Sequence, residues 1–347
     1  MSRQPSTPQA DADLRDRIRA YPGNLTFHDL IRRNRRQSAV LMVVMVALAV
    51  GIGGAIASAV AVYGGAAKDA RFFIPSILLG CGVGLVLALI AASWSWFSGA
   101  NAVLGMVHAV PVTREMDAEL VNVVEEIAIA AGLPVPKVYL IPESALNAFA
   151  TGRDPAHGVV AITTGLRARL NREQLQGVIA HEIAHIRHLD IRFSMLMATM
   201  VGLIVFACDA FLRIAFHSGR YGGGRRGSNN KGGGAAVVIV IVIALVLAVV
   251  APLVARLIQM AYSRQREYLA DAGAVELTRN PEGLASALAV LANDSEPLVE
   301  TANRGMAHMF IVNPLRKMRE SHQQLSSVFS SHPPVKERIA RLLALAR

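Results

Sequence analysis

Four long runs without a charged side chain constrain this 347-residue sequence more than any other feature. They span residues 37–67, 72–113, 193–208 and 232–255. A helix that crosses a membrane needs about 20 consecutive, predominantly apolar residues. Three of the runs exceed that length, and the third stays apolar to Phe216 apart from Asp209 and Arg213. The runs therefore predict membrane-spanning helices, because a purely soluble domain could not bury so much apolar surface.

The composition agrees with a membrane protein and excludes two other classes. Hydrophobic residues make up 53% of the chain and charged residues only 17%, whereas soluble domains carry about 25% charged residues. Intrinsic disorder requires low hydrophobicity, so it cannot describe most of this chain. The two cysteines, Cys81 and Cys208, both lie inside apolar runs, which excludes a disulfide scaffold.

The segments between and after the runs have the patterns of soluble protein. Only the short segment 64–71 joins the first two runs, so we expect these runs to form a helical hairpin. Periodicity and turn signals then predict a helix over 116–131, strands over 137–141 and 158–163, a helix that begins after Asn171 as its N-cap, and helices near 281–293 and 334–346.

The strongest local motif is His181-Glu182-Ile183-Ala184-His185, in the predicted helix that follows Asn171. Residues four apart on a helix face the same side, so both imidazoles can reach one metal ion. Zn²⁺ accepts neutral imidazole well. Glu182 lies beside such an ion without needing to bind it, and it can take a proton from a water molecule whose pKa the metal lowers. The motif therefore predicts a zinc site with Glu182 as catalytic base.

A catalytic zinc ion usually has a third protein ligand and one open position. The candidates for the third ligand are His188, Asp190, Glu267, Asp271, His308, His322 and His332. His188 is better explained as a solvated histidine or as a neighbour of a ligand. Glu267 is the better candidate, because it lies four residues before Asp271 on one predicted helix. One of these carboxylates can bind the metal while the other orients a metal-bound histidine.

Four motifs in order along the chain extend this interpretation: NAFATG at 147–152, HEIAH at 181–185 followed by Asp190, SRQREYLAD at 263–271, and HPP at 332–334. Together they resemble the HtpX-like membrane zinc metalloproteases, which are gluzincins related to the CAAX prenyl proteases. The similarity runs from about residue 100 to residue 345, with apolar hairpins in the matching places. The basic N-terminal tail and a Gly- and Arg-rich loop look longer or more basic than is typical of that family.

The resemblance implies a role for each motif. His181, His185 and Glu267 would bind one Zn²⁺ per chain, and Glu182 would be the catalytic base. Asp271 would act near the site, and His332 would help to stabilise the transition state. Residues 147–152 would form an edge strand for an extended substrate, with Asn147, Ala148 and Phe149 as substrate-side residues. The implied activity is endopeptidase cleavage of misfolded or damaged membrane proteins, as part of a stress response.

The proposed ligands also restrict the membrane topology. His185 and Glu267 must lie on the same side of the membrane to bind one ion, so an even number of crossings separates them. Because 232–255 is a strong span, either the weaker run 193–216 crosses as well or the stronger run is re-entrant; we predict the first arrangement, which gives four spans. Cytoplasmic segments carry an excess of Lys and Arg. The eight arginines of residues 1–38 and those beside the motifs favour a cytoplasmic site in a bacterial inner membrane, whereas the basic loop 217–235 argues against it.

We therefore predict a mostly helical α+β integral membrane protein with four transmembrane helices in two hairpins and a gluzincin-like cytoplasmic catalytic domain. Its parts are a basic cytoplasmic tail (1–38), transmembrane hairpin 1 (39–98), the first part of the catalytic domain (99–192), hairpin 2 with the Gly- and Arg-rich loop (193–258), and the second part of the catalytic domain (259–347). His185 precedes the third run by eight residues, roughly 12 Å of helix, so we expect the zinc just above the bilayer surface.

The predicted partners are the lipid bilayer and membrane-protein or peptide substrates. The net charge of +10 also suggests nucleic acid, but the basic loop lacks the interleaved aromatic residues on which bases stack, so we expect no nucleic-acid partner. Two alternative functions remain. One is a CAAX-type prenyl protein endopeptidase, which is expected to have more than four spans. The other is a non-catalytic membrane scaffold with a structural zinc ion, which leaves the base Glu182 unexplained.

Overall fold

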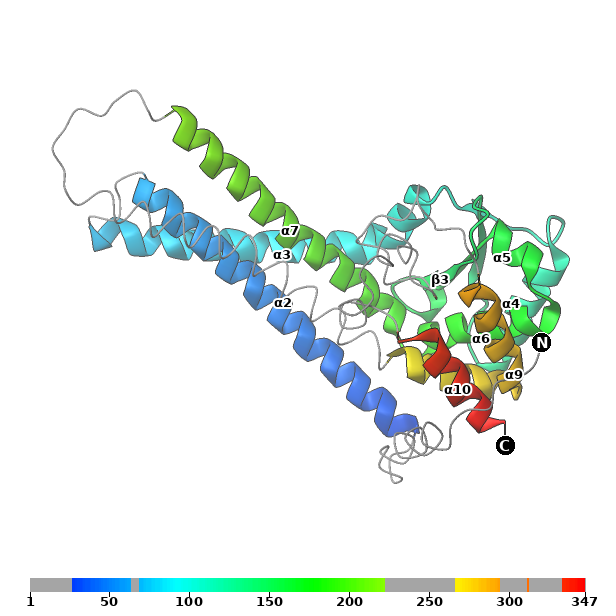
Figure 1. Ribbon diagram of the computed structural model, residues 1–347. Helices are drawn as coiled ribbons and strands as arrows, with labels where there is room; N and C mark the ends of the chain where they lie inside the picture. Colours follow the sequence, from blue (N-terminus) through cyan, green and yellow to red (C-terminus); the bar gives the residue numbers. More distant parts are fainter. Residues whose placement is uncertain (1–26, 64–68, 222–265, 294–310, 312–332, 347) are drawn as a thin grey trace.

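Three long helices extend away from a part that contains a small sheet and shorter helices (Figure 1). The computed structural model describes residues 27–63, 69–221, 266–293, 311 and 333–346. Within these ranges the long helices are α2 (Phe27–Tyr63), α3 (Ala70–Met106) and α7 (Asp190–Tyr221). Most of the described residues are helical, which agrees with the predicted α+β class.

Each long helix contains a stretch that is long and apolar enough to cross a membrane. These stretches are Ala39–Ala61, Arg71–Met106 and Asp190–Ala210. The first has 23 residues, about 34 Å of helix, which exceeds the roughly 30 Å thickness of a hydrocarbon core. Large apolar side chains such as Leu79 and Phe97 on α3 are exposed, as lipid-facing side chains are. The chain is an integral membrane protein; its fourth predicted span, 232–255, lies outside the described residues.

Glycines hold α2 and α3 together as the predicted hairpin. Gly53 lies against Gly80, and Ala49 lies against Gly84, so the two helices run antiparallel. A Cβ added at Gly80 would lie 2.3 Å from the Cβ of Ala57 and 2.5 Å from the carbonyl oxygen of Gly53. Small residues of this kind let helix backbones approach closely where lipid supplies no hydrophobic drive for association.

The sheet carries the strand that borders the site. Its order is β1-β2-β4-β3, with β1 at Val110–Pro111, β2 at Lys137–Ile141, β3 at Ala148–Thr151 and β4 at Val159–Thr163. β2 pairs with β4 in parallel, and β3 pairs with β4 antiparallel. β2 and β4 confirm the two predicted strands. β3 lies at the edge of the sheet, so one row of its backbone groups faces away from the ladder.

The shorter helices cover the sheet and enclose the main apolar core. They are α4 (Ala118–Ala130), η2 (Pro155–His157), α5 (Thr164–Arg169), α6 (Arg172–Arg187), α9 (Pro281–Ala292) and α10 (Val335–Leu345), together with helical residues 266–278. Core residues from separate elements, such as Leu120, Ile162, Ile179 and Leu288, are fully buried. Asn171 caps α6 as predicted, and Gln174 completes a capping box with it.

Two of the long helices continue directly into this part. α3 runs unbroken past residue 99, and Val103 and Leu104 near its end pack against Ile141 and Phe149 of the sheet. The link to α7 is a sharp corner, in which Leu189 has a φ of 63°, a conformation that a non-glycine residue rarely adopts. We expected about 12 Å of continuous helix after His185, and this was wrong, because α6 ends at Arg187 and α7 already begins at Asp190.

We expect Gly80→Ala to destabilise the hairpin, because its new methyl group would overlap Ala57 and the Gly53 carbonyl. Overpacking of this kind costs about 1–3 kcal/mol. Thermal unfolding in detergent measures the loss. Gly82→Ala is the matched control, since a Cβ there meets nothing within 4 Å. Equal melting temperatures for the two variants would contradict the close helix contact.

Candidate metal centre

Two histidines of α6 supply the first half of the site. His181 is fully buried and His185 partly buried, because α6 packs most of its surface against the core. Their Nε2 atoms lie 3.2 Å apart, and the rings meet edge to face. The i, i+4 spacing thus brings one nitrogen of each ring to the same point, as the motif predicts.

Glu267 approaches these nitrogens from the helix over residues 266–278. Its Oε2 lies 3.6 Å from Nε2 of His181, and its Oε1 lies 3.7 Å from Nε2 of His185. One ligand atom from each of the three residues falls within 4.8 Å of the others. Ligand atoms about 2.0–2.1 Å from a tetrahedral zinc ion lie about 3.3 Å from one another. The three side chains therefore fit a zinc ion.

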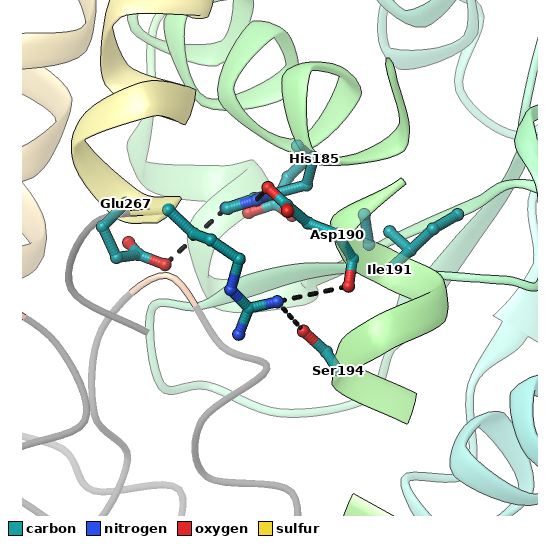
Figure 2. A pocket seen from close by; sticks show the side chains of 8 residues that line it. His185, Asp190, Ile191, Ser194 and Glu267 are labelled. Carbon is teal, nitrogen blue, oxygen red and sulfur yellow. Dashed lines mark hydrogen bonds and ion pairs between the residues drawn. The ribbon is translucent and has the colours of Figure 1, made fainter. Parts of the chain in front are cut away.

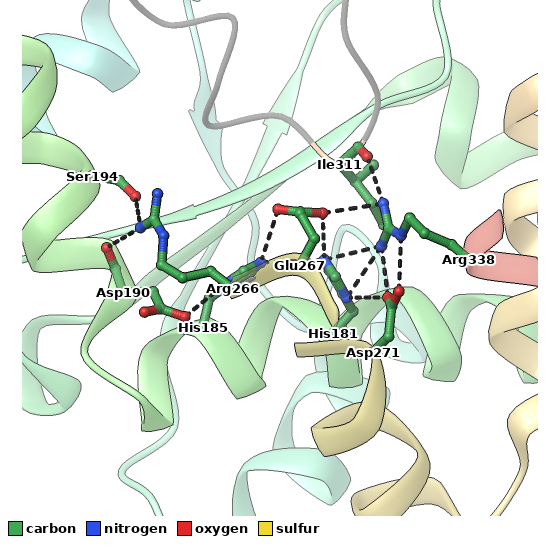
Figure 3. Close-up of polar contacts among 9 residues, drawn as sticks. All are labelled: His181, His185, Asp190, Ser194, Arg266, Glu267, Asp271, Ile311 and Arg338. Atoms are coloured by element: carbon green, nitrogen blue, oxygen red, sulfur yellow. Dashed lines mark hydrogen bonds and ion pairs between the residues drawn. The ribbon is translucent and has the colours of Figure 1, made fainter. Parts of the chain in front are cut away.

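A carboxylate holds the other ring nitrogen of each histidine. Asp271 Oδ1 lies 3.0 Å from Nδ1 of His181, and Asp190 Oδ2 lies 3.1 Å from Nδ1 of His185 (Figure 3). Partners on Nδ1 fix the tautomer and leave both Nε2 atoms for a metal ion. Asp271 thus lies beside the site, as the resemblance implies, and Asp190 is its counterpart on α7.

A buried arginine, Arg338 of α10, completes this network. Its Nε and Nη2 lie 2.9 and 2.7 Å from the two carboxylate oxygens of Asp271, a bidentate pair. Its Nη1 lies 3.1 Å from Oε2 of Glu267 and donates at 3.1 Å to the backbone carbonyl of Ile311. The guanidinium group also lies against the ring of His181 (Figure 3).

The charges of the buried groups match a divalent cation. Four carboxylates (Glu182, Asp190, Glu267 and Asp271) and two guanidinium groups (Arg266 and Arg338) are buried here. With both imidazoles neutral, these groups leave two negative charges. Burial alone lowers the pKa of His181, but its hydrogen bonds to Asp271 and Glu267 outweigh that and raise the pKa to about 9. A bound cation would replace that proton and balance the carboxylates.

A small pocket opens beside the metal-binding group (Figure 2). Its lining consists of Ala150, Glu182, His185, Asp190, Ile191, Ser194, Arg266 and Glu267. Glu182 is 2% exposed, and burial raises the pKa of its carboxyl group. An acid whose pKa lies nearer to neutral is better suited to take up and return a proton. The pocket therefore combines metal ligands with a candidate base.

Other predicted residues lie elsewhere. Asn147 and Phe149 are buried, and Phe149 packs in the core beside α3, so Ala150 is the β3 residue that lines the pocket. His188 is the C-cap of α6, and burial lowers its pKa to about 4. It is not among the three clustered ligands of the described residues. His308, His322 and His332 lie outside the described residues.

Two site residues escaped the sequence analysis. Arg338 carried a signal, because it occupies the same helical face as Val335 and Leu342 on α10, where a charge is out of place unless it is paired. Arg266 stands next to Glu267 and donates to the backbone carbonyl of Asp190 at 3.2 Å and to Ser194. No sequence pattern predicts the contact between Arg266 and Asp190, which lie 76 residues apart.

Two histidines on a helix, a carboxylate from a second helix and an adjacent buried glutamate define a metal-dependent hydrolase site in a membrane protein. The sequence model of "Peptidase family M48" matches residues 114–346, which contain every described member of the site. The chain belongs to peptidase family M48.

Individual relatives agree with this assignment. A "Protease HtpX homolog" of Thermodesulfovibrio yellowstonii is 47% identical over 263 residues, which are 76% of this chain and 88% of the relative. The homolog of Lactobacillus helveticus is 38% identical over 90% of this chain and 97% of its own length. The crystal structure of S. mikatae Ste24p aligns with 78% of this chain and 65% of that chain, at 21% identity and a TM-score of 0.42, a likeness too weak to support an argument.

We expect Arg338→Met to lower the free energy of unfolding by about 3–5 kcal/mol, because it would leave the buried carboxylates of Asp271 and Glu267 without their cation. Chemical denaturation in detergent measures this loss. Lys336→Met removes an exposed cation from the same helix and should change stability by less than about 0.5 kcal/mol. A similar small effect for both variants would show that the network does not depend on Arg338.

Proposed function

We propose that this M48 peptidase is a zinc-dependent endopeptidase that cleaves membrane proteins, including misfolded or damaged ones. The observation that carries the proposal is the arrangement around Glu182: a buried carboxyl group, pKa raised, in a pocket with His185 and Glu267. Two imidazole nitrogens and one carboxylate oxygen form a donor set that zinc accepts with a position left for water or substrate. The relatives named as proteases support the same activity.

The chain's own groups divide the chemistry between them. Zinc held by His181, His185 and Glu267 would polarise a carbonyl group and lower the pKa of a water molecule. Glu182 takes the proton from the attacking water and returns it to the leaving amine. Asp271 and Asp190 hold the two imidazoles by their Nδ1 atoms, so that the rings keep their orientation during the reaction.

The substrate binds as an extended strand at the outer edge of β3, on the side away from β4. Ala150 of this strand lines the pocket, and main-chain hydrogen bonds of an added strand give affinity with little sequence preference. Low sequence preference suits an enzyme that removes many different damaged proteins. It also favours a general endopeptidase over a prenyl-peptide endopeptidase, and the base Glu182 argues against a silent scaffold.

The position of the site relative to α7 supports substrates at the membrane surface. Asp190, the first residue of α7 and of a candidate span, is also the partner of His185. α7 is one candidate crossing between His185 and Glu267, so a second crossing by residues 232–255 returns the chain to the same side. This gives four spans, in the five parts defined above, with the catalytic domain in the cytoplasm of a bacterium and the spans in its inner membrane.

We expect Glu182→Gln to keep the metal and to lose proteolysis, because the amide preserves the shape of the side chain but cannot accept the proton. General acid–base catalysis contributes about 10²–10⁴-fold, so kcat/KM on casein should fall at least 100-fold. Elemental analysis of the purified variant checks the zinc content. Glu173→Gln, at an exposed position of the same helix, is the control. Wild-type cleavage by Glu182→Gln would refute this chemistry.

We expect two engineered cysteines to lie on opposite faces of the membrane. In a background without Cys81 and Cys208, Arg71→Cys at the exposed start of α3 should react with a membrane-impermeant maleimide added to intact spheroplasts. Glu282→Cys, exposed on α9, should react only after the membrane is permeabilised. The reverse pattern would place the catalytic domain outside the cytoplasm.

A further inference from the structure

The free edge of β3 offers few backbone groups to a substrate. Asn147 accepts from the Thr163 N–H, so its carbonyl group points toward β4. Backbone groups alternate in direction along a strand, so those of Phe149 and Thr151 also point to β4. Those of Ala148 and Ala150 point away from β4. Of these two, Ala150 lines the pocket beside Glu182 and His185.

Ile311 already occupies the position beside Ala148. Its backbone N–H donates to the Ala148 carbonyl group at 3.0 Å, so it takes the place that an added strand would take. The side chain of Ile311 is 2% exposed and belongs to the main core. The backbone of Ile311 is therefore held in place on one side by β3 and by its own buried side chain.

The other side of Ile311 is fixed by the metal-site network. Its carbonyl group accepts from Nη1 of Arg338 at 3.1 Å, and the same Nη1 lies 3.1 Å from Glu267 (Figure 3). Ile311 thus connects strand β3 to Arg338, the partner of the metal ligand Glu267. Displacing it would break a hydrogen bond to a fully buried guanidinium group, which is costly. A substrate strand will therefore not replace Ile311 easily.

We propose that Ile311 is a specificity-determining residue that limits the length of substrate paired with β3. The inference rests on the proposed endopeptidase function. A substrate pairs with the N–H and C=O of Ala150. The next acceptor along the strand is the Ala148 carbonyl group, which already accepts from the Ile311 N–H. Residues of the substrate beyond that point leave the sheet. Cleavage then depends on a short stretch of backbone on that flank, so an exposed loop or a frayed helix end is sufficient as a substrate.

A series of peptides of increasing length on either side of one scissile bond tests this limit. For the wild-type enzyme, kcat/KM should stop rising on one flank at the residue that pairs with Ala150. Ile311→Pro removes the N–H donor and frees the Ala148 carbonyl group. In this variant, two further residues on that flank should raise kcat/KM about five-fold, the effect of one net hydrogen bond. Ile311→Val keeps the N–H and should keep the length limit of the wild type.

N-methylation of the peptide backbone gives a second test that needs no variant. In the wild type, N-methylation of the residue that pairs with Ala150 should lower kcat/KM about five-fold or more. N-methylation two residues further toward Ala148 should change it less than two-fold. In Ile311→Pro the second position should become sensitive as well. If Ile311→Pro does not fold, as judged by its melting temperature and zinc content, the wild-type comparison alone decides.

Two results would overturn the proposal. One is wild-type sensitivity to N-methylation at both positions, which would show that the substrate displaces Ile311. The other is an unchanged length limit in a folded, zinc-containing Ile311→Pro. Failure of the proposed function looks different, because the wild-type enzyme would then cleave no peptide of any length, methylated or not.

Discussion

The ion pair between Arg338 and Asp271 is the interaction on which the other contacts of the site depend. Arg338 belongs to the last helix of the chain, yet its guanidinium group contacts Asp271, Glu267, His181 and the Ile311 backbone. A fully buried arginine is stable only when each of its donors has a partner, and here the partners come from three other segments. Helix α10 therefore docks in one position only. That position fixes the helix over residues 266–278, which carries Glu267, against α6.

Two of the membrane helices pack directly against the catalytic part, and one of them, α7, contacts the metal centre. α3 ends against the sheet, and α7 begins at the residue that holds His185. At this junction Arg192 of α7 stacks 4.2 Å from the ring centre of Trp96 on α3, an arginine–tryptophan contact of the kind found at membrane interfaces. Arg266, on the helix over residues 266–278, donates to the Asp190 carbonyl group and so ties that helix to the start of α7. A tilt of α7 would thus move both a histidine partner and the neighbour of Glu267.

The sequence predicted those features that depend on short-range patterns. Spacing of four residues placed His181 with His185 and Glu267 with Asp271, and uncharged runs placed the helices α2, α3 and α7. It could not predict the partners of Arg338, which lie 67 and 157 residues away, nor the contact of Ile311 with Ala148. It also missed the corner at Leu189, because a left-handed leucine has no local signature. Tertiary contacts between distant segments decide the first two, and residue spacing does not encode them.

Proton chemistry in this site requires that its carboxyl groups differ, and their surroundings make them differ. Asp271 is buried, which raises its pKa, but the charges and hydrogen bonds of Arg338 and His181 together outweigh burial and lower the pKa overall. Glu182 is equally buried, and no described side chain forms an ion pair with it, so burial prevails and raises its pKa. Groups whose pKa values are pushed apart take different roles in catalysis. Asp271 has the lowered pKa and orients His181, whereas Glu182 has the raised pKa and holds a proton more readily. Arg338, which anchors α10, acts together with His181 to separate the structural carboxylate from the one suited to act as a base.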